Sequence, residues 1–182
     1  MEDKFDINRV IETDRLIMMF ITEEDKHDLF MNICHDRPVL DYYLANYVEY
    51  EKDSPVGRWI RYYTEARLYG FAVRLKSTGE TIGFLNQVRV EPSLGLTELG
   101  YAFGSRHWGK GYATEALSAA IDFFFGLGYK TVECGFIKEN VASGRVMQKC
   151  GMHFVREEKN GITHRGRSWD VEYYAISAGP GA

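Results

Sequence analysis

The spacing of hydrophobic residues in the first third of the chain predicts one strand and two helices. Residues 15–21 are apolar and bounded by polar positions, as expected for a strand. Thr22 has the side chain of a helix N-cap, and the acidic residues after it suit the first turn of a helix. Ser54 and Pro55 predict the start of a second helix. Its apolar face repeats at i, i+3, i+4 and i+7, with Val56, Trp59, Ile60 and Tyr63.

The pattern after this helix predicts strands separated by turns, and two further helices. We expect Gly70 to end the second helix. Three strands are predicted to follow, over residues 71–75, 81–90 and 96–103. The next helix ends near residues 126–128, and its apolar face comprises Ala113, Ala116, Leu117, Ala120, Ile121 and Phe124. The last predicted elements are a strand at 131–137, a helix from Asn140 to Gly151, and paired strands at 153–157 and 168–176.

This order of elements indicates the fold class. A strand, two helices, three strands, a helix, a strand, a helix and two strands predict an α/β (α+β) protein. Its mixed sheet should be mostly antiparallel and flanked by helices, with one β-α-β unit in the middle. No repeat or low-complexity linker divides the chain, so we expect a single domain over residues 1–182.

Composition and charge argue against several functional classes for this protein. Hydrophobic residues make up 45% of the 182 positions, enough for a core, and the net charge of −4 opposes nucleic-acid binding through a broad basic field. The three cysteines have no C-x-x-C spacing, so neither a disulfide framework nor a metal site is expected. No apolar run approaches ~18 residues and no signal-peptide pattern opens the chain. We therefore expect a cytoplasmic protein without a membrane partner.

The stretch GSRHWGKGYATEAL, residues 104–117, carries the clearest chemical signal. It follows a predicted strand and runs into a predicted helix, whose first amides have no partner within the helix. Those amides and the helix dipole attract anions. Gly109 and Gly111 let the backbone approach a phosphate closely. The stretch therefore predicts a phosphate-binding loop, with a simple tight turn as the alternative.

Two familiar phosphate loops do not fit this stretch. A P-loop needs Ser or Thr after its lysine to bind Mg²⁺, and Gly111 occupies that position. A dinucleotide fingerprint, G-x-G-x-x-G, fails at its third glycine, which is Thr114 here. Nucleotide triphosphate hydrolysis and dinucleotide binding are both disfavoured.

A third loop does fit. RHWGKG, residues 106–111, matches [RQ]-x-x-G-x-[GA], the acyl-coenzyme-A pyrophosphate loop of the GNAT superfamily of N-acetyltransferases. The sequence around it, ELGYAFGSRHWGKGYATEAL, resembles the Rim-type branch that acetylates the N-termini of ribosomal proteins. IETDRLIMMFI and NVASGRVMQKCGM resemble two other motifs of that branch. The resemblance covers nearly the whole chain and is weakest over residues 36–56.

The resemblance implies acetyl-CoA as co-substrate, with no metal. Backbone amides of residues 107–113 would surround the pyrophosphate, while Arg106 and Lys110 either add charge or remain solvated. The strand before the loop would separate from the next strand, and pantetheine would lie between residues 99–103 and 132–137. The expected cofactor-binding residues are Leu99, Tyr101, Phe103, Arg106, His107, Trp108, Gly109, Lys110, Gly111, Tyr112, Ala113, Asn140 and Ser143.

Catalytic roles follow from the same resemblance. A backbone amide near Tyr101 would polarise the thioester carbonyl. Asn140 would bind the pantetheine arm, cap its helix, or do both. Many members of the superfamily carry a tyrosine acid seven residues after the asparagine, where this chain has Met147, so Ser143 is the expected acid toward the leaving thiolate. Glu98 opens the strand beside the cofactor and is the first candidate for the base.

The other acids are weaker candidates. Glu133 and Glu158 could also serve as the base. In the segment expected to shape the acceptor pocket, any of four acids could attract a cation: Asp41, Glu49, Glu51 or Asp53. Cys134 is the one cysteine on the cofactor side and the one to check as an acyl carrier.

Together these features predict an enzyme that moves an acetyl group from acetyl-CoA to a primary amine. The amine would attack directly in a ternary complex. The acceptor would be a protein N-terminal α-amine, with a polyamine or an antibiotic as alternatives, and the enzyme a monomer or homodimer. The rival from another class is a non-catalytic acyl-CoA-binding module, favoured by the missing tyrosine at Met147.

Overall fold

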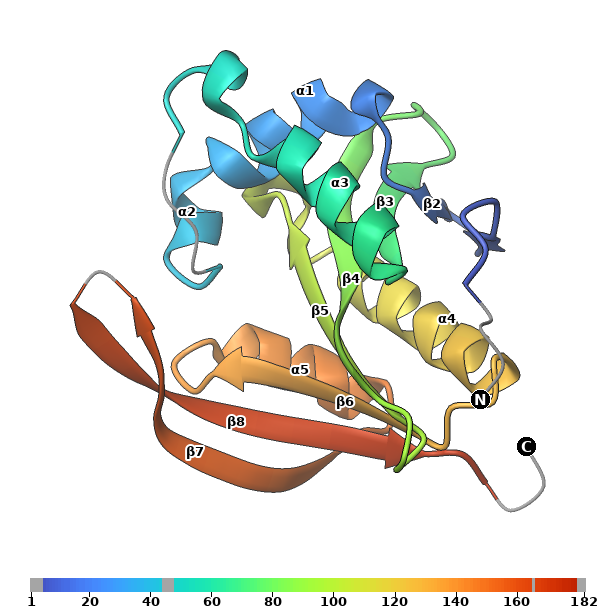
Figure 1. Ribbon diagram of the computed structural model, residues 1–182. Helices are drawn as coiled ribbons and strands as arrows, with labels where there is room; N and C mark the ends of the chain where they lie inside the picture. Colours follow the sequence, from blue (N-terminus) through green and yellow to red (C-terminus); the bar gives the residue numbers. More distant parts are fainter. Residues whose placement is uncertain (1–4, 44–47, 165, 180–182) are drawn as a thin grey trace.

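The computed structural model describes residues 5–43, 48–164 and 166–179. Its framework is a sheet with the strand order β1-β2-β3-β4-β5-β6-β8-β7 (Figure 1). The strands are β1 (Val10–Glu12), β2 (Leu16–Phe20), β3 (Gly70–Leu75), β4 (Thr81–Glu91), β5 (Leu96–Phe103), β6 (Thr131–Ile137), β7 (His153–His164) and β8 (Arg167–Ser177). Neighbouring strands are antiparallel except β5 and β6, which are parallel. The expected mixed, mostly antiparallel α/β fold is confirmed.

Helices cover both faces of the sheet. They are α1 (Lys26–Leu29), α2 (Arg37–Leu40), α3 (Val56–Ala66), α4 (Tyr112–Gly126) and α5 (Val141–Lys149), with shorter helical turns at Glu23–Asp25, Phe30–Cys34, Glu51–Asp53 and Ser105–His107. One hydrophobic core lies between the sheet and α4 with α5, and a second lies under α1 and α3 (Figure 1). Within the described residues, no helix is long and apolar enough to cross a membrane.

The helix faces predicted from hydrophobic spacing are the buried ones. On α4 the fully or nearly fully buried residues are Ala116, Leu117, Ala120, Ile121 and Phe124. On α3, Val56 and Tyr63 are buried, and Trp59 and Ile60 pack against the same core. Thr22 stands before the first helical turn, where its backbone N–H donates to Asp25 Oδ2 over 2.9 Å. A period of 3.6 residues therefore identified these surfaces from the sequence.

The prediction that Gly70 ends α3 is wrong. The helix ends at Ala66, and Arg67 follows in the left-handed region with φ of 53°. Gly70 is instead the first residue of β3, where an added Cβ would lie 2.7 Å from Tyr63 Cδ2. The glycine is needed for the close approach of α3 to the strand.

The structure differs from the prediction in one additional strand, β1, and in the extent of β7 and β8. β1 was not predicted, because three residues at the edge of a sheet are too few to establish an alternating pattern. β7 runs to His164, well beyond its predicted end at residue 157, whereas β8 extends the predicted strand 168–176 by one residue at each end. The outer part of β7 is polar and largely exposed, and so it lacks the hydrophobic signal of a strand.

Candidate active site

The centre of the sheet opens where β5 and β6 part. Their parallel pairing runs from Leu96 with Thr131 to Leu99 with Cys134 and then ends. Beyond that point residues 100–103 pair only with β4, and residues 135–137 pair only with β8. Figure 1 shows the two strands together at their first residues and diverging toward their ends. The separation that the resemblance to the GNAT superfamily implies is therefore present.

The glycine loop lies at the end of one of these diverging strands. A single turn at Ser105–His107 follows β5, and α4 begins at Tyr112. Gly109 and Gly111 have φ of 73° and 82°, in the left-handed region that favours glycine. The unpaired first amides of α4 therefore follow the loop directly, and such amides suit an anion.

The basic side chains of the loop differ in their pairing. The Arg106 guanidinium forms an ion pair with Glu80, and its Nε donates to His107 Nε2 over 3.1 Å. Lys110 is exposed, and its ammonium forms no ion pair with any described residue. Trp108 Nε1 donates to the Phe103 carbonyl over 2.7 Å and ties the loop to β5. Of the two predicted cations, Lys110 is the one whose charge is free.

Asn140 and Ser143 meet at the start of α5, on the other diverging side. The Ser143 backbone N–H donates to Asn140 Oδ1 over 3.3 Å, which caps the helix. Asn140 Nδ2 donates to Ser143 Oγ over 3.0 Å. The serine oxygen thus accepts a hydrogen bond, while among the described residues its own proton has no acceptor.

Tyr101 connects the two sides. Its hydroxyl donates to the Ser143 carbonyl over 3.1 Å, and burial raises the pKa of this phenol. Tyr101 is therefore a neutral donor that fixes the first turn of α5 to β5. Met147, where many superfamily members carry a tyrosine, is buried in the core and contributes no polar group.

Two predicted base candidates are paired across β5 and β6, one residue before the strands part. Glu98 on β5 is opposite Glu133 on β6. Arg89 lies between them, with Nε 3.2 Å from Glu98 and Nη2 3.2 Å from Glu133. Burial raises the pKa of Glu98 despite the opposing effect of Arg89. Glu98 thus holds protons more strongly than an exposed carboxylate, as a base for an amine should.

The other base candidates are held more firmly or lie further out. The buried Glu133 carboxylate receives both terminal nitrogens of Arg156, with Nη2 at 2.9 Å from Oε1. Glu158 pairs with Arg156 at 3.3 Å and accepts from the Tyr173 hydroxyl over 3.3 Å. These carboxylates serve the packing of the β7–β8 ribbon against β6.

Cys134 is a poor candidate for an acyl carrier. The residue is fully buried on β6, and burial raises the pKa of its thiol well above the ordinary value. A thiol must lose its proton to become a nucleophile. At neutral pH this sulfur is protonated and enclosed.

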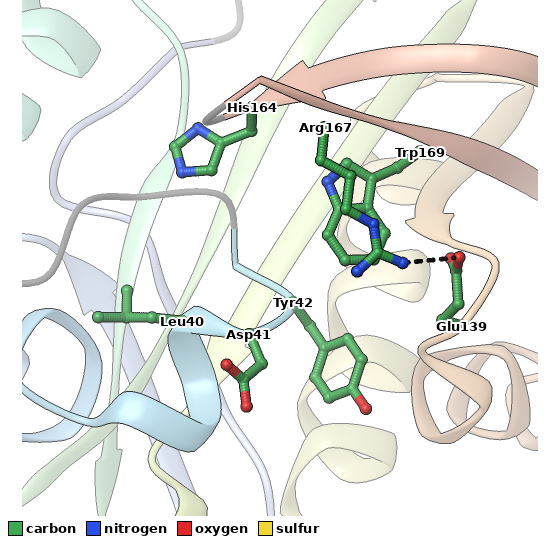
Figure 2. A pocket seen from close by; sticks show the side chains of 7 residues that line it. All are labelled: Leu40, Asp41, Tyr42, Glu139, His164, Arg167 and Trp169. Carbon is green, nitrogen blue, oxygen red and sulfur yellow. Dashed lines mark ion pairs between the residues drawn. The ribbon is translucent and has the colours of Figure 1, made fainter.

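A cavity of about 510 Å³ lies between the end of α2 and the tip of the β7–β8 ribbon (Figure 2). It is lined by Leu40, Asp41, Tyr42, Glu139, His164, Arg167 and Trp169. Arg167 stacks on Trp169, 3.4 Å from the ring centroid, and pairs with Glu139 at 3.5 Å. Glu139 directly precedes Asn140, so this cavity adjoins the start of α5.

Sequence reasoning found only part of this cavity. Of the four acids expected to attract a cation, Asp41 lines it, whereas Glu51 pairs with His27 at 2.9 Å. His164, Arg167 and Trp169 were not predicted as site residues, because only the length of the β7–β8 ribbon brings them opposite α2. Their signal in the sequence is the run HRGRSW, residues 164–169, which places basic and aromatic side chains at the start of the last predicted strand.

Comparison with known proteins settles the family. A family model described as an acetyltransferase (GNAT) domain matches residues 15–153. The chain belongs to the GNAT acetyltransferase family. It is 27% identical over 169 residues to the uncharacterized N-acetyltransferase YoaA of Bacillus subtilis, covering 92% of this chain and 96% of that protein. A GNAT acetyltransferase from Bacillus anthracis is 26% identical, with a TM-score of 0.80 over 93% of this chain and 98% of the other.

Two more distant structures share the GNAT fold. A proposed ribosomal-protein-serine acetyltransferase from Vibrio cholerae has a TM-score of 0.79 at 22% identity, covering 94% of this chain and 99% of the other. The microcin C7 self-immunity acetyltransferase MccE, in complex with acetyl-CoA and AMP, has a TM-score of 0.82 at 16% identity, covering 91% and 94%. The present chain is thus an acetyl-CoA-dependent acetyltransferase by family, with an acceptor that must be argued from its own site.

Proposed function

We propose that this GNAT acetyltransferase moves an acetyl group directly to the α-amine of a peptide or protein N-terminus. The observation that carries the proposal is the parting of β5 and β6 after Leu99 and Cys134. The glycine loop lies at the end of one strand, and Asn140 with Ser143 follows the other. Donor and acceptor can therefore enter the same opening from opposite faces of the sheet.

The donor side fits acetyl-CoA, which supplies the activated acetyl thioester. Backbone amides of residues 107–113 and the free ammonium of Lys110 would hold its pyrophosphate. Leu99, Tyr101 and Phe103 alternate toward the α4 and α5 face and would contact the pantetheine arm. Asn140 would bind the arm from the other side while it caps α5.

Different polar groups at the opening would stabilise the oxyanion, protonate the thiolate and deprotonate the amine. A backbone amide near Tyr101 would stabilise negative charge on the carbonyl oxygen. The Ser143 hydroxyl, whose oxygen accepts from Asn140, would give its proton to the departing thiolate. Glu98, with its raised pKa, would accept the proton of the attacking amine.

The modest strength of this base favours an α-amine. An α-amine with pKa ~7.8 is roughly one-tenth neutral at pH 7, whereas a lysine amine with pKa ~10.4 is under a thousandth neutral. Because Arg89 pairs with Glu98, the carboxylate is less basic than burial alone would make it. Such a base suits an acceptor that is already partly neutral.

The cavity beside Glu139 supports a peptide rather than a polyamine. Asp41 and Glu139 would attract the ammonium end of an acceptor. Two ring nitrogens there, His164 Nε2 and Trp169 Nε1, are shielded from solvent and lack a hydrogen-bond partner within the described residues. The indole N–H can only donate. A peptide that displaced Arg167 from Trp169 would offer a carbonyl oxygen to it, and a polyamine has no such acceptor.

The decisive experiment measures CoA release with three acceptors. These are a short peptide with a free N-terminus, the same peptide with its N-terminus blocked but a lysine present, and spermidine. We expect turnover with the first alone. Preferred turnover of spermidine or the lysine peptide would overturn the α-amine assignment.

Ligand binding tests the donor site separately. A ligand that binds only the folded protein at ~100 times its Kd adds about 2.7 kcal/mol of stability. We expect a rise in Tm with acetyl-CoA and none with ATP or NAD. A rise with ATP instead would contradict the assignment of the glycine loop to the coenzyme A pyrophosphate.

A further inference from the structure

The segment before β2 binds the first turn of α4 through a single carboxylate. Thr13 Oγ1 donates to Glu115 Oε1 over 2.6 Å, and the Arg15 backbone N–H donates to the same oxygen over 2.9 Å. Arg15 Nε and Nη2 both lie 2.6 Å from Glu115 Oε2. Burial raises the pKa of Glu115, but the hydrogen bonds from Thr13 and Arg15 outweigh it and leave that pKa lowered. Both oxygens of an ionised Glu115 are therefore held.

The same guanidinium also contacts the end of the glycine loop. Arg15 Nη1 donates to the Lys110 carbonyl over 3.0 Å. Its central carbon lies 4.5 Å from the centroid of the Tyr112 ring. A Cβ placed on Gly111 would lie 3.4 Å from Arg15 Nη2. Arg15 thus spans three consecutive residues at the entrance to α4. We call Thr13, Arg15 and Glu115 the loop clamp.

The hydrogen bond from Arg15 to the Lys110 carbonyl also fixes the direction of the Gly111 N–H. In a trans peptide the carbonyl of one residue and the N–H of the next point in opposite directions. The described chain contains no cis peptide, so the Gly111 N–H points away from Arg15 when the Lys110 carbonyl points toward it. Glycine at φ of 82° tolerates many other orientations, and the hydrogen bond selects one of them.

We propose that Arg15, held in place by Glu115, is a positioning residue for the pyrophosphate of acetyl-CoA. It aims the Gly111 amide and braces the first turn of α4 without being the group that contacts the phosphate. This inference rests on the proposed function, in which the glycine loop holds that pyrophosphate. It also gives a physical reason why the ETDRL segment and the GKGYATEAL segment occur together in one chain.

If Arg15 contacted the phosphate directly, substitution of Glu115 would have the opposite effect on acetyl-CoA affinity. The Arg15 side chain is 46% exposed and carries a positive charge near the loop, so it could attract phosphate directly. In that case Glu115→Gln would free the guanidinium and strengthen acetyl-CoA binding. If Arg15 instead acts through its position, the same change loosens the clamp and weakens binding. The sign of the effect separates the two roles.

The experiment is calorimetric measurement of the acetyl-CoA Kd in a matched set of variants. Loss of a charge-assisted hydrogen bond predicts a Kd increase of roughly tenfold or more for Arg15→Gln, and several-fold for Glu115→Gln. Arg15→Lys keeps the charge, but one ammonium cannot reproduce the planar fork, so we expect a loss close to that of Arg15→Gln. The control is Lys76→Gln, which removes a nearby cation paired with Glu12 at 3.0 Å, and its Kd should stay unchanged.

A second donor distinguishes positioning from general damage to the fold. Acetyl-pantetheine carries the thioester but no pyrophosphate, so its kcat/KM should be the same in Arg15→Lys and the unmodified enzyme. Tighter acetyl-CoA binding by Glu115→Gln, full affinity in Arg15→Lys, or equal losses with both donors would each overturn the clamp. If the unmodified enzyme bound both donors equally well, the loop would not hold the pyrophosphate, and the proposed donor site would fail along with the clamp.

Discussion

The proposed donor side and the proposed acceptor side of the β5–β6 opening are built by different means. The proposed donor side comes from two short stretches, residues 98–113 and 140–143, and uses mainly backbone groups, glycine conformations and helix starts. The acceptor side combines three separate segments, around Asp41, Glu139 and the tip of the β7–β8 ribbon, and uses side chains of both charges. A site formed by backbone groups of a short segment can be recognised as a sequence motif, whereas a site formed by side chains from distant segments cannot.

This difference makes the two sides separable by kinetics. Changes on the donor side should alter the acetyl-CoA Kd whichever amine is offered. Changes around the cavity should alter the acceptor KM at constant acetyl-CoA affinity. Groups at the opening itself, such as Glu98 and Ser143, should alter kcat most.

The largest effect is expected for Glu98→Gln. Removing a general base lowers kcat/KM by roughly 10²–10⁴. Burial raises the pKa of Glu98, so the activity of the unmodified enzyme should fall as pH drops through that raised pKa, where the base becomes protonated. The variant should lack this limb of the pH profile and keep its acetyl-CoA Kd. Glu12→Gln, an exposed acid on β1, is the control, and full activity in Glu98→Gln would reject this residue as the base.

Ser143→Ala should reduce kcat next most, by roughly 10² for loss of a general acid. In the variant the backbone N–H of residue 143 can still donate to Asn140 Oδ1. The N-cap of α5 should therefore remain, and Tm should change little. Steady-state kinetics at saturating acetyl-CoA measures the effect. Ser143→Thr retains a hydroxyl and should recover part of the rate. Unchanged kcat in the alanine variant would show that thiolate leaves without this proton.

On the donor side, Gly111→Ala should weaken acetyl-CoA binding about tenfold, because left-handed backbone costs a residue with Cβ roughly 1–2 kcal/mol. The new Cβ would also lie 3.4 Å from Arg15 Nη2. Calorimetry gives the Kd, and the acceptor KM should not move. Gly126→Ala is the matched control, since Gly126 ends α4 outside the left-handed region with open space around its Cα. It should leave binding intact.

On the acceptor side, Asp41→Asn should raise the peptide KM by about two- to fivefold, because Asp41 is exposed and an exposed ion pair is worth up to about 1 kcal/mol. The acetyl-CoA Kd should remain constant. Asp53→Asn alters an acid of the same region that does not line the cavity and serves as the control. Equal changes in both variants would mean that general surface charge, rather than the cavity, attracts the acceptor.

The smallest effect is expected for Arg106→Gln. Its guanidinium is 61% exposed and already paired with Glu80, so its loss should change the acetyl-CoA Kd by less than about threefold. Lys110→Gln should weaken binding more, because no described acid neutralises that ammonium. A titration of each variant with acetyl-CoA compares them. A reversed order would assign the phosphate contact to Arg106.

Local sequence determined the backbone conformation of the segments in the proposed donor side. The bounds of β5 and β6 agree with the predicted strands because their alternation and bounding turns are local properties. The buried face of α4 follows from a 3.6-residue period. The conformations of Gly109 and Gly111 and the capping role of Asn140 could be predicted because left-handed backbone and helix capping each select a few residue types.

Tertiary structure alone decided the features that depend on distant packing. Gly70 looked like a helix end, yet the chain needs it because Tyr63 packs against the first residue of β3. Arg15 and Glu115 meet across a separation of 100 residues, and no local period reports such a contact. The cavity exists because a long polar ribbon reaches the end of α2. Backbone conformation is encoded by neighbours along the chain, whereas the meeting of remote side chains is set by how the sheet and helices pack.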